Sequence, residues 1–170
     1  MAARQARVRV EIDHWPELRE RLRSIRGAAV AIGIQGTEAR LADPDEPAVS
    51  VLDKATRNEL GLGVPERPAI RSAFDAHISE WASRLERHLR AWLVGQMPAE
   101  TALNLVGVRA TADTKQVMVQ WSTPPNAEAT IAEKGFDNPL VRTGQLVNSV
   151  RHLTTLPDGR TSGTIAPGGS

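Results

Sequence analysis

One long amphipathic stretch, from about Ala69 to Val94, constrains the fold of this chain most strongly. Large side chains recur there at alternating spacings of four and three residues: Phe74, Ile78, Trp81, Leu85, His88 and Trp92. This spacing places them on one face of an α-helix and leaves the opposite face to charged residues. With a rise of about 1.5 Å per residue, such a helix is nearly 40 Å long and crosses a whole domain of this size.

The N-terminal part predicts a strand, a helix and a second strand. Residues 7–13 and 28–34 alternate in the period of two that is typical of β-strands. Between them, an early proline and a following Gly27 bound a short helix at residues 16–25. Residues 35–47 are polar, contain two prolines and lack periodicity. We expect a flexible loop there, which assembly with a partner would order.

Two more helices are expected next to the long one. Residues 49–60 form the first, with an apolar face made of Val49, Leu52, Thr56 and Leu60. The second begins near Pro98, and its apolar face consists of Leu103, Val106, Ala110, Val117 and Trp121. Its end is ambiguous, because residues 117–121 also fit a short strand.

The C-terminal part predicts a short helix followed by a hairpin. Asn126 is suited to cap a helix at residues 127–134, which Gly135 would end. Residues 146–156 are rich in valine, leucine and threonine, which favours a strand, and the turn at residues 157–159 leads to a pairing strand at residues 161–165.

These elements together predict an α+β fold. A small, mostly antiparallel sheet, built from the N-terminal strands and the C-terminal hairpin, packs against the long amphipathic helices. A length of 170 residues suits a single domain over residues 1–170, with a flexible loop at 35–47 and a flexible tail at 166–170. No stretch approaches the ~20 apolar residues of a membrane span.

Composition argues against several function classes. The 21 lysines and arginines nearly balance the 20 acids, so no global basic field exists to hold nucleic acid. Aromatic residues make up only 4%, which disfavours a stacking platform for single strands. The absence of cysteine excludes a disulfide framework, a thiolate metal site and a cysteine nucleophile.

No motif points to catalysis or metal binding. The four histidines are isolated in sequence, and we expect His88 to be a packed, hydrogen-bonded core residue. The acids Asp43, Asp45 and Glu46 could bind a hard cation, but their spacing favours a solvated loop. We therefore expect no enzymatic activity, no cofactor and no metal.

The arginines Arg84, Arg87 and Arg90 of the long helix have two interpretations. They could contact nucleic acid phosphates, or they could form intrahelical pairs with Glu80 and Glu86 on a solvated or subunit-facing surface, which we favour. A small arginine-rich nucleic-acid-binding protein is therefore an alternative function. A hydrolase built from scattered acids and histidines is a weaker one.

Two segments resemble one known family, the neck and tail-completion proteins of tailed bacteriophages. Residues 58–74, NELGLGVPERPAIRSAF, are similar to its NEFG…IPxRPFLRPA signature. Residues 124–150, PPNAEATIAEKGFDNPLVRTGQLVNSV, are similar to its NxxxTIxxKGxxxPLxDTGxLxxSI segment. The two segments occur in the family's order, separated by a helical stretch of similar length. This chain departs from the pattern at Leu60, at Ala69-Ile70 and at Arg142, where an arginine replaces the family's aspartate.

The resemblance implies a structural virion protein of the head–tail junction. Such a protein forms a ring, with a hexamer favoured over a dodecamer, that joins the DNA-filled head to the tail. The implied partners are copies of itself and other phage neck, head-closure or tail-terminator proteins, with passive contact to DNA in the channel and none to a membrane. It would assemble in the host cytoplasm and reside in the virion.

The motif residues are the candidates for subunit contacts or for holding the subunit together. Glu59 is expected to form a charge-assisted pair with Arg67 or Arg71, within the subunit or between subunits. The two arginines would share a face if their helix began by Arg67. Thr143 and Gly144 would make the turn that leads into the strand at 146–156. The full set is Glu59, Arg67, Arg71, Lys134, Arg142, Thr143 and Gly144.

Overall fold

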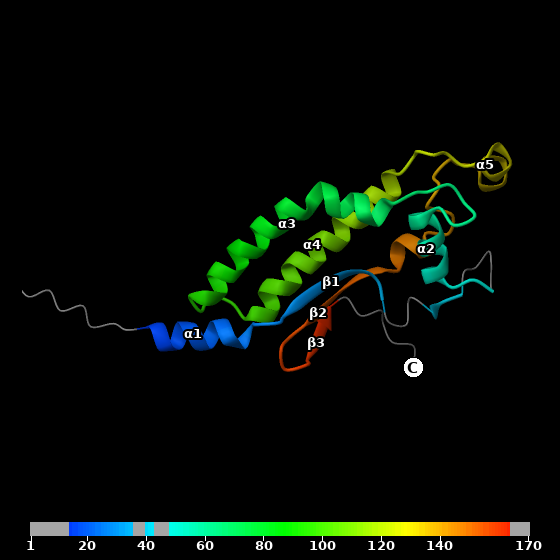
Figure 1. The fold of residues 1–170 in the computed structure, drawn as a ribbon. Coiled ribbons are helices and arrows are strands. Elements are labelled where there is room, and N and C mark those ends of the chain that lie inside the picture. Colours follow the sequence, from blue (N-terminus) through cyan, green and yellow to red (C-terminus); the bar gives the residue numbers. More distant parts are fainter. Residues whose placement is uncertain (1–13, 36–39, 43–47, 164–170) are drawn as a thin grey trace, which may run out of the picture.

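The computed structural model describes residues 14–35, 40–42 and 48–163. Within them the chain is an α+β protein, as predicted, with long helices packed against a small antiparallel sheet (Figure 1). The elements in order are α1 (Trp15–Ser24), β1 (Ala29–Ile34), α2 (Val51–Leu60), α3 (Ala69–Leu93), α4 (Ala99–Gln120), α5 (Glu128–Lys134), α6 (Gln145–Asn148), β2 (Val150–Thr155) and β3 (Thr161–Gly163).

The long helices α3 and α4 lie side by side, and α4 lies between α3 and the sheet (Figure 1). Between them Trp81 is buried with Val106 and Ala110, and Phe74 meets the Trp81 ring edge-on at a centroid distance of 5.1 Å. The indole N–H of Trp81 donates to a carboxylate oxygen of Asp113, 2.9 Å away. This bond matters because a buried indole without an acceptor would cost free energy.

The sheet has the order β1-β2-β3, and both pairs of neighbours are antiparallel. Ile32 of β1 is opposite His152 of β2, and α4 covers the sheet. Gly107 lies where α4 crosses β2: a Cβ there would be 2.3 Å from a ring carbon of His152. Only a glycine allows this close approach.

A second apolar cluster joins α2 and α6 to the end of α4 and the start of β2. It contains Val51 and Ala55 of α2, Met118 of α4, and a C-terminal group of Leu140, Leu146, Val147 and Val150. Ser50 caps α2, because its hydroxyl accepts from the Asp53 N–H and the Asp53 carboxylate accepts from the Ser50 N–H.

Most predicted helices and the hairpin are confirmed. The helices predicted at 16–25, 69–94 and 127–134 appear within one or two residues of those limits, and residues 117–120 are helical rather than extended. The strand at 28–34 and the hairpin after residues 157–159 are also present. Asn126 is not a helix cap: residue 127 occupies that position without a side-chain hydrogen bond.

Three predictions are wrong: where one strand begins, and which residues are buried on two of the helices. The strand predicted at 146–156 begins only at Val150, because residues 145–148 form the short helix α6. The buried face of α2 is Val51 and Ala55, whereas Leu52 and Leu60 are exposed. On α3, Trp81 and Trp92 are buried, but Ile78 is half exposed.

The buried histidine is also not the predicted one. His88 is only partly buried, whereas His152 is 3% exposed and lies beside Asn104, with its Nε2 3.3 Å from the amide oxygen. The prediction chose His88 because it has the same spacing as the large apolar residues of its helix. His152, in contrast, interrupts the alternation of apolar and polar residues in its strand.

Some predictions concern residues outside the described ranges: the strand at 7–13, most of the loop at 35–47 with its acidic cluster, and the tail at 166–170. No helix in the described part of the chain is long and apolar enough to cross a membrane.

Candidate functional site: a basic pocket between the two motif segments

The first motif segment forms the elbow between α2 and α3. Glu59, near the end of α2, points its carboxylate at the beginning of α3, where it accepts hydrogen bonds from the backbone N–H groups of Ile70 (3.2 Å) and Arg71 (2.8 Å). Pro68 precedes α3 and provides no side-chain cap. Glu59 therefore caps a helix to which it does not belong, and its negative charge also suits the positive end of that helix.

The side chain of Arg71, in the first turn of α3, reaches back to the end of α2. Its guanidinium donates to the Glu59 carbonyl at 2.6 Å and to the Glu66 carboxylate at 2.7 Å. Within the subunit, the side chain of Glu59 therefore pairs with Arg71, whose Nε lies 3.8 Å from the Glu59 carboxylate, and the hydrogen bonds of Arg67 go to other residues. Helix α3 begins at Ala69, so Arg67 lies outside it and the two arginines do not share a helical face.

Arg67 connects the elbow to the second motif segment. It is 7% exposed, and its guanidinium donates to the carbonyl oxygens of Pro124 (3.2 Å) and Pro125 (3.1 Å) and to the side-chain oxygen of Asn58 (3.4 Å). Burial lowers the pKa of Arg67, and the nearby Asp137 carboxylate partly opposes that shift. The guanidinium nevertheless stays charged, as arginine does throughout proteins.

In the second motif segment, residues 124–150, Lys134 and Arg142 form contacts with other residues of the same segment. Lys134, at the end of α5, donates to the backbone carbonyls of Asn138 (3.1 Å) and Val141 (3.0 Å). Arg142 donates to the Glu133 carboxylate at 2.8 Å, so the arginine at the family's aspartate position forms an ion pair of its own. Gly144 has a φ of 78°, a left-handed conformation that glycine adopts without strain, and it leads directly into α6.

These two segments and α2 surround a pocket of about 280 Å³. Five of the seven candidate residues line it: Arg67, Lys134, Arg142, Thr143 and Gly144. Glu59 and Arg71 lie outside its lining, on the elbow behind it. The pocket also includes Asn58, the first residue of the first motif segment, and Lys54 and Arg57 of α2. Lys54 and Arg57 were not among the candidates, because nothing in the sequence of α2 shows which later segment will lie opposite it.

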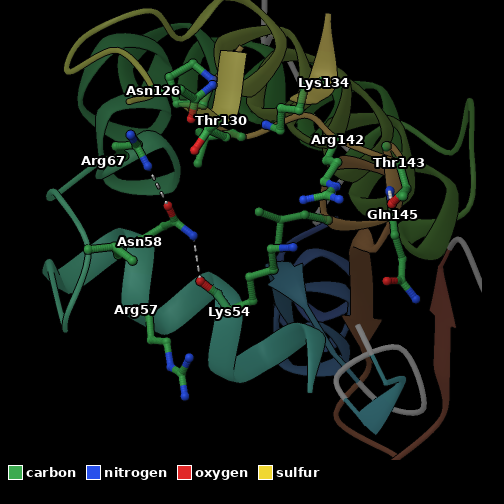
Figure 2. Close-up of a pocket in the computed structure, with 15 residues that line it drawn as sticks. Lys54, Arg57, Asn58, Arg67, Asn126, Thr130, Lys134, Arg142, Thr143 and Gln145 are labelled. Carbon is green, nitrogen blue, oxygen red and sulfur yellow. Dashed lines mark hydrogen bonds between the residues drawn. The ribbon is translucent and has the colours of Figure 1, made fainter. Parts of the chain in front are cut away.

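The charged residues among the described lining of this pocket are all basic. Five cations line it, Lys54, Arg57, Arg67, Lys134 and Arg142, and none of the described lining residues is an aspartate or glutamate. Figure 2 shows Lys134 and Arg142 reaching toward the space from one side and Lys54 from α2 on the other, while the head of Arg57 points away. Asn58, Asn126, Thr130, Thr143 and Gln145 add polar groups to the lining. The lining is therefore mostly polar and offers many hydrogen-bond donors.

The other candidate surface is the face of α3 that carries Arg84, Arg87 and Arg90. Neighbouring acids compensate the positive charge of two of these arginines. Arg84 pairs with Glu80 at 2.9 Å and Arg90 with Glu86 at 2.5 Å, as the spacing predicted. Glu80 is also 3.8 Å from Arg109 of α4. In the described part of the chain, no group of three His, Asp or Glu side chains could hold a metal ion.

Comparisons with protein families, with curated proteins and with solved structures give no match to this chain. The resemblance of the two segments to the phage family therefore rests on the motif residues themselves and on their order along the chain.

Proposed function

We propose that this chain is a structural neck or tail-completion protein of a tailed bacteriophage, which assembles into a ring at the head–tail junction. In this role it makes and breaks no covalent bonds. The observation that carries the proposal is the contact between the two segments that resemble the family. Arg67 of the first donates to the carbonyls of Pro124 and Pro125, where the second begins, although the helices α3 and α4 separate them in sequence.

Exposed apolar residues support an assembling role. Leu105, Val108 and Val119 follow the outer side of α4 and are 44%, 56% and 52% exposed. A different group is exposed along α2 and just after it: Leu52, Leu60 and Leu62. Apolar residues gathered in this way are typical of surfaces that another protein covers. Two unlike patches on one subunit are what a head-to-tail ring requires, because one patch meets the other on the next copy.

The assembly can be tested with a charge placed on the α4 patch. We expect Val108→Asp to prevent formation of the ring, measured by native mass spectrometry over a range of protein concentrations, without changing the thermal unfolding of the subunit. Ser79→Asp, at an exposed position of α3, is the matched control and should assemble like the wild type. Equal assembly of the Val108→Asp protein would exclude α4 from the subunit contact.

The biological role is tested by deleting the gene from its phage. The proposal predicts filled heads and separate, complete tails in the lysate, and restoration of infectious particles by a plasmid copy. Normal infectious particles without the gene would refute it.

The nucleic-acid alternative receives less support from the structure, because Glu80 and Glu86 pair with two of the three arginines on which it depends. It predicts DNA affinity that falls steeply as salt is raised. Absence of DNA retention at low salt would eliminate it.

A further inference from the structure

We propose that residues 7–13 of one copy of this chain pair with the open edge of β1 in the next copy and add a fourth strand to its sheet. The inference deepens the assembly role and rests on it, because it names one contact between copies in the ring. Three observations carry it: an open sheet edge, an apolar helix flank beside that edge, and the direction of α1.

The sheet formed by the described residues is open at β1. In the order β1-β2-β3, β2 is paired on both sides, whereas β1 has a strand on one side only. Edge strands offer backbone N–H and C=O groups to a further strand, and proteins often block such pairing with a charge or a proline. The six residues of β1, AVAIGI, contain neither. β1 is therefore suited to accept an added strand.

The open edge is the one next to α3. Successive positions three residues apart on α4 turn by about 60° around the helix, and Asn104, Gly107 and Ala110 contact different neighbours. Asn104 bonds to β3 and Gly107 contacts β2. Ala110 lies in a cluster with Trp81 of α3, and Ile32 of β1 packs against the same cluster. The order around α4 is thus β3, β2, β1 and then α3.

The flank of α3 on this side is apolar and incompletely covered. Gly107 contacts the sheet at His152, and Arg109, about 200° further around α4, lies on the side away from the sheet. Arg109 approaches Glu80 of α3 at 3.8 Å, so Glu80 also lies away from the sheet. By the same rotation of about 200°, Ile78 lies on the flank of α3 toward the sheet, where it is 51% exposed. A strand beside β1 would cover it.

Residues 7–13 have the sequence pattern that such a strand needs. They lie outside the described part of the chain, and their sequence, RVRVEID, alternates apolar and charged residues. In a strand paired with β1, the apolar residues Val8, Val10 and Ile12 would share one face and could pack against the helices. The charged residues would then face solvent.

The direction of α1 assigns this strand to another copy. Figure 1 shows α1 continuing outward from the start of β1, and none of its residues is buried. Its ten residues are about 15 Å long, and seven extended residues span about 23 Å. Residues 7–13 would have to run back along α1 before they reached their own β1. Only about 8 Å would remain for a strand of about 20 Å. The β1 of a neighbouring copy does not impose this limit.

The contact can be tested first by assembly of the full-length protein. We expect Val10→Asn to raise the concentration at which half of the protein is in rings by tenfold or more, measured by native mass spectrometry. Arg9→Asn is the matched control: it introduces the same residue at the adjacent position, on the solvent face, and should assemble like the wild type. Rings of Val10→Asn that form as readily as those of the wild type would overturn the proposal.

Cysteine cross-linking then locates the strand, since the chain has no cysteine of its own. Ile78→Cys is combined in turn with Val8→Cys, Val10→Cys and Ile12→Cys, and each full-length protein is oxidised at a concentration at which rings form. We expect at least one pair to give a ladder of disulfide-linked multimers on a denaturing gel, and the control pair with Arg9→Cys to give none. No ladder from any of the three pairs, or a disulfide that forms only within one chain, would overturn the proposal.

The two levels of the account fail in different ways. A wild-type protein that stays monomeric at every concentration would refute the ring and with it the proposed function. Wild-type rings that persist in Val10→Asn would refute only the added strand.

Discussion

Glu59 and Arg71 hold the elbow between α2 and α3 through a reciprocal contact. The carboxylate of Glu59 accepts from the backbone N–H of Arg71 at 2.8 Å, and the guanidinium of Arg71 donates to the backbone carbonyl of Glu59 at 2.6 Å. Each side chain thus satisfies a main-chain group at the end of the other residue's helix. The direction of the longest helix is set by this pair as well as by the prolines around it.

Replacing Glu59 should destabilise the fold. In Glu59→Ala the N–H groups of Ile70 and Arg71 lose their acceptor, so we expect a loss of about 1–2 kcal/mol in the free energy of unfolding, measured with urea. The control is Glu66→Ala, which removes only an exposed ion pair with Arg71 and should change stability by less than about 0.5 kcal/mol. Equal effects of the two substitutions would refute the capping role.

Arg67 should not tolerate replacement by lysine. A single ammonium cannot reproduce the three donors that reach Pro124, Pro125 and Asn58, and it would stay buried with poorer partners. We expect Arg67→Lys to cost about 2 kcal/mol or more in urea unfolding. Arg142→Lys, at an exposed ion pair with Glu133, should cost less than about 0.5 kcal/mol. A stable Arg67→Lys protein would mean that this contact does not hold the two segments together.

Gly107 should be essential for the packing of α4 on the sheet. Alanine is the better helix former by about 1 kcal/mol, but its Cβ would overlap the His152 ring, so Gly107→Ala should destabilise by about 1–3 kcal/mol. The same substitution in a His152→Ala background should be neutral or stabilising, because the overlapping ring is gone. Thermal unfolding of the wild type, Gly107→Ala, His152→Ala and the double variant measures both effects. An equal loss in both backgrounds would contradict the proposed clash.

His152 should make stability depend on pH. Burial lowers the pKa of His152 below its usual 6.5, so between the two values the unfolded chain binds more protons than the folded one. Stability is therefore complete above about pH 6.5 and falls as the pH drops toward the folded-state pKa, by up to about 1.4 kcal/mol per pH unit.

The measurement is urea unfolding of the wild type and of His152→Gln from pH 5 to pH 8. The variant should lose this part of the pH dependence, whereas His77→Gln, on the partly exposed side of α3, should keep it. An unchanged pH profile in His152→Gln would show that another group is responsible.

Periodicity was sufficient to predict the long helices and the fold class, because α3 and α4 are long enough for their apolar faces to repeat several times. It failed for α6, whose four residues are too few to show a helical repeat. It also failed for the face of α2, where Leu52 and Leu60 are apolar but exposed, so hydrophobicity did not identify the buried side.

The site was only partly predictable for a different reason. Arg67 was identified through its motif, but its burial was not anticipated, because an arginine is ordinarily exposed. Its partners are backbone carbonyls at Pro124 and Pro125, which carry no side-chain signal. Lys54 joins the pocket from α2, and only the folded arrangement brings it opposite Arg142 (Figure 2).

The central claim is that this protein is a building block at the junction of a phage head and tail. The most direct measurement is immunogold electron microscopy of purified particles, with antibodies raised against the purified chain. The account predicts gold at the neck of intact particles, and on one end of heads or tails that have separated. Labelling of the capsid shell or the distal tail tip, or particles that carry no label at all, would contradict it.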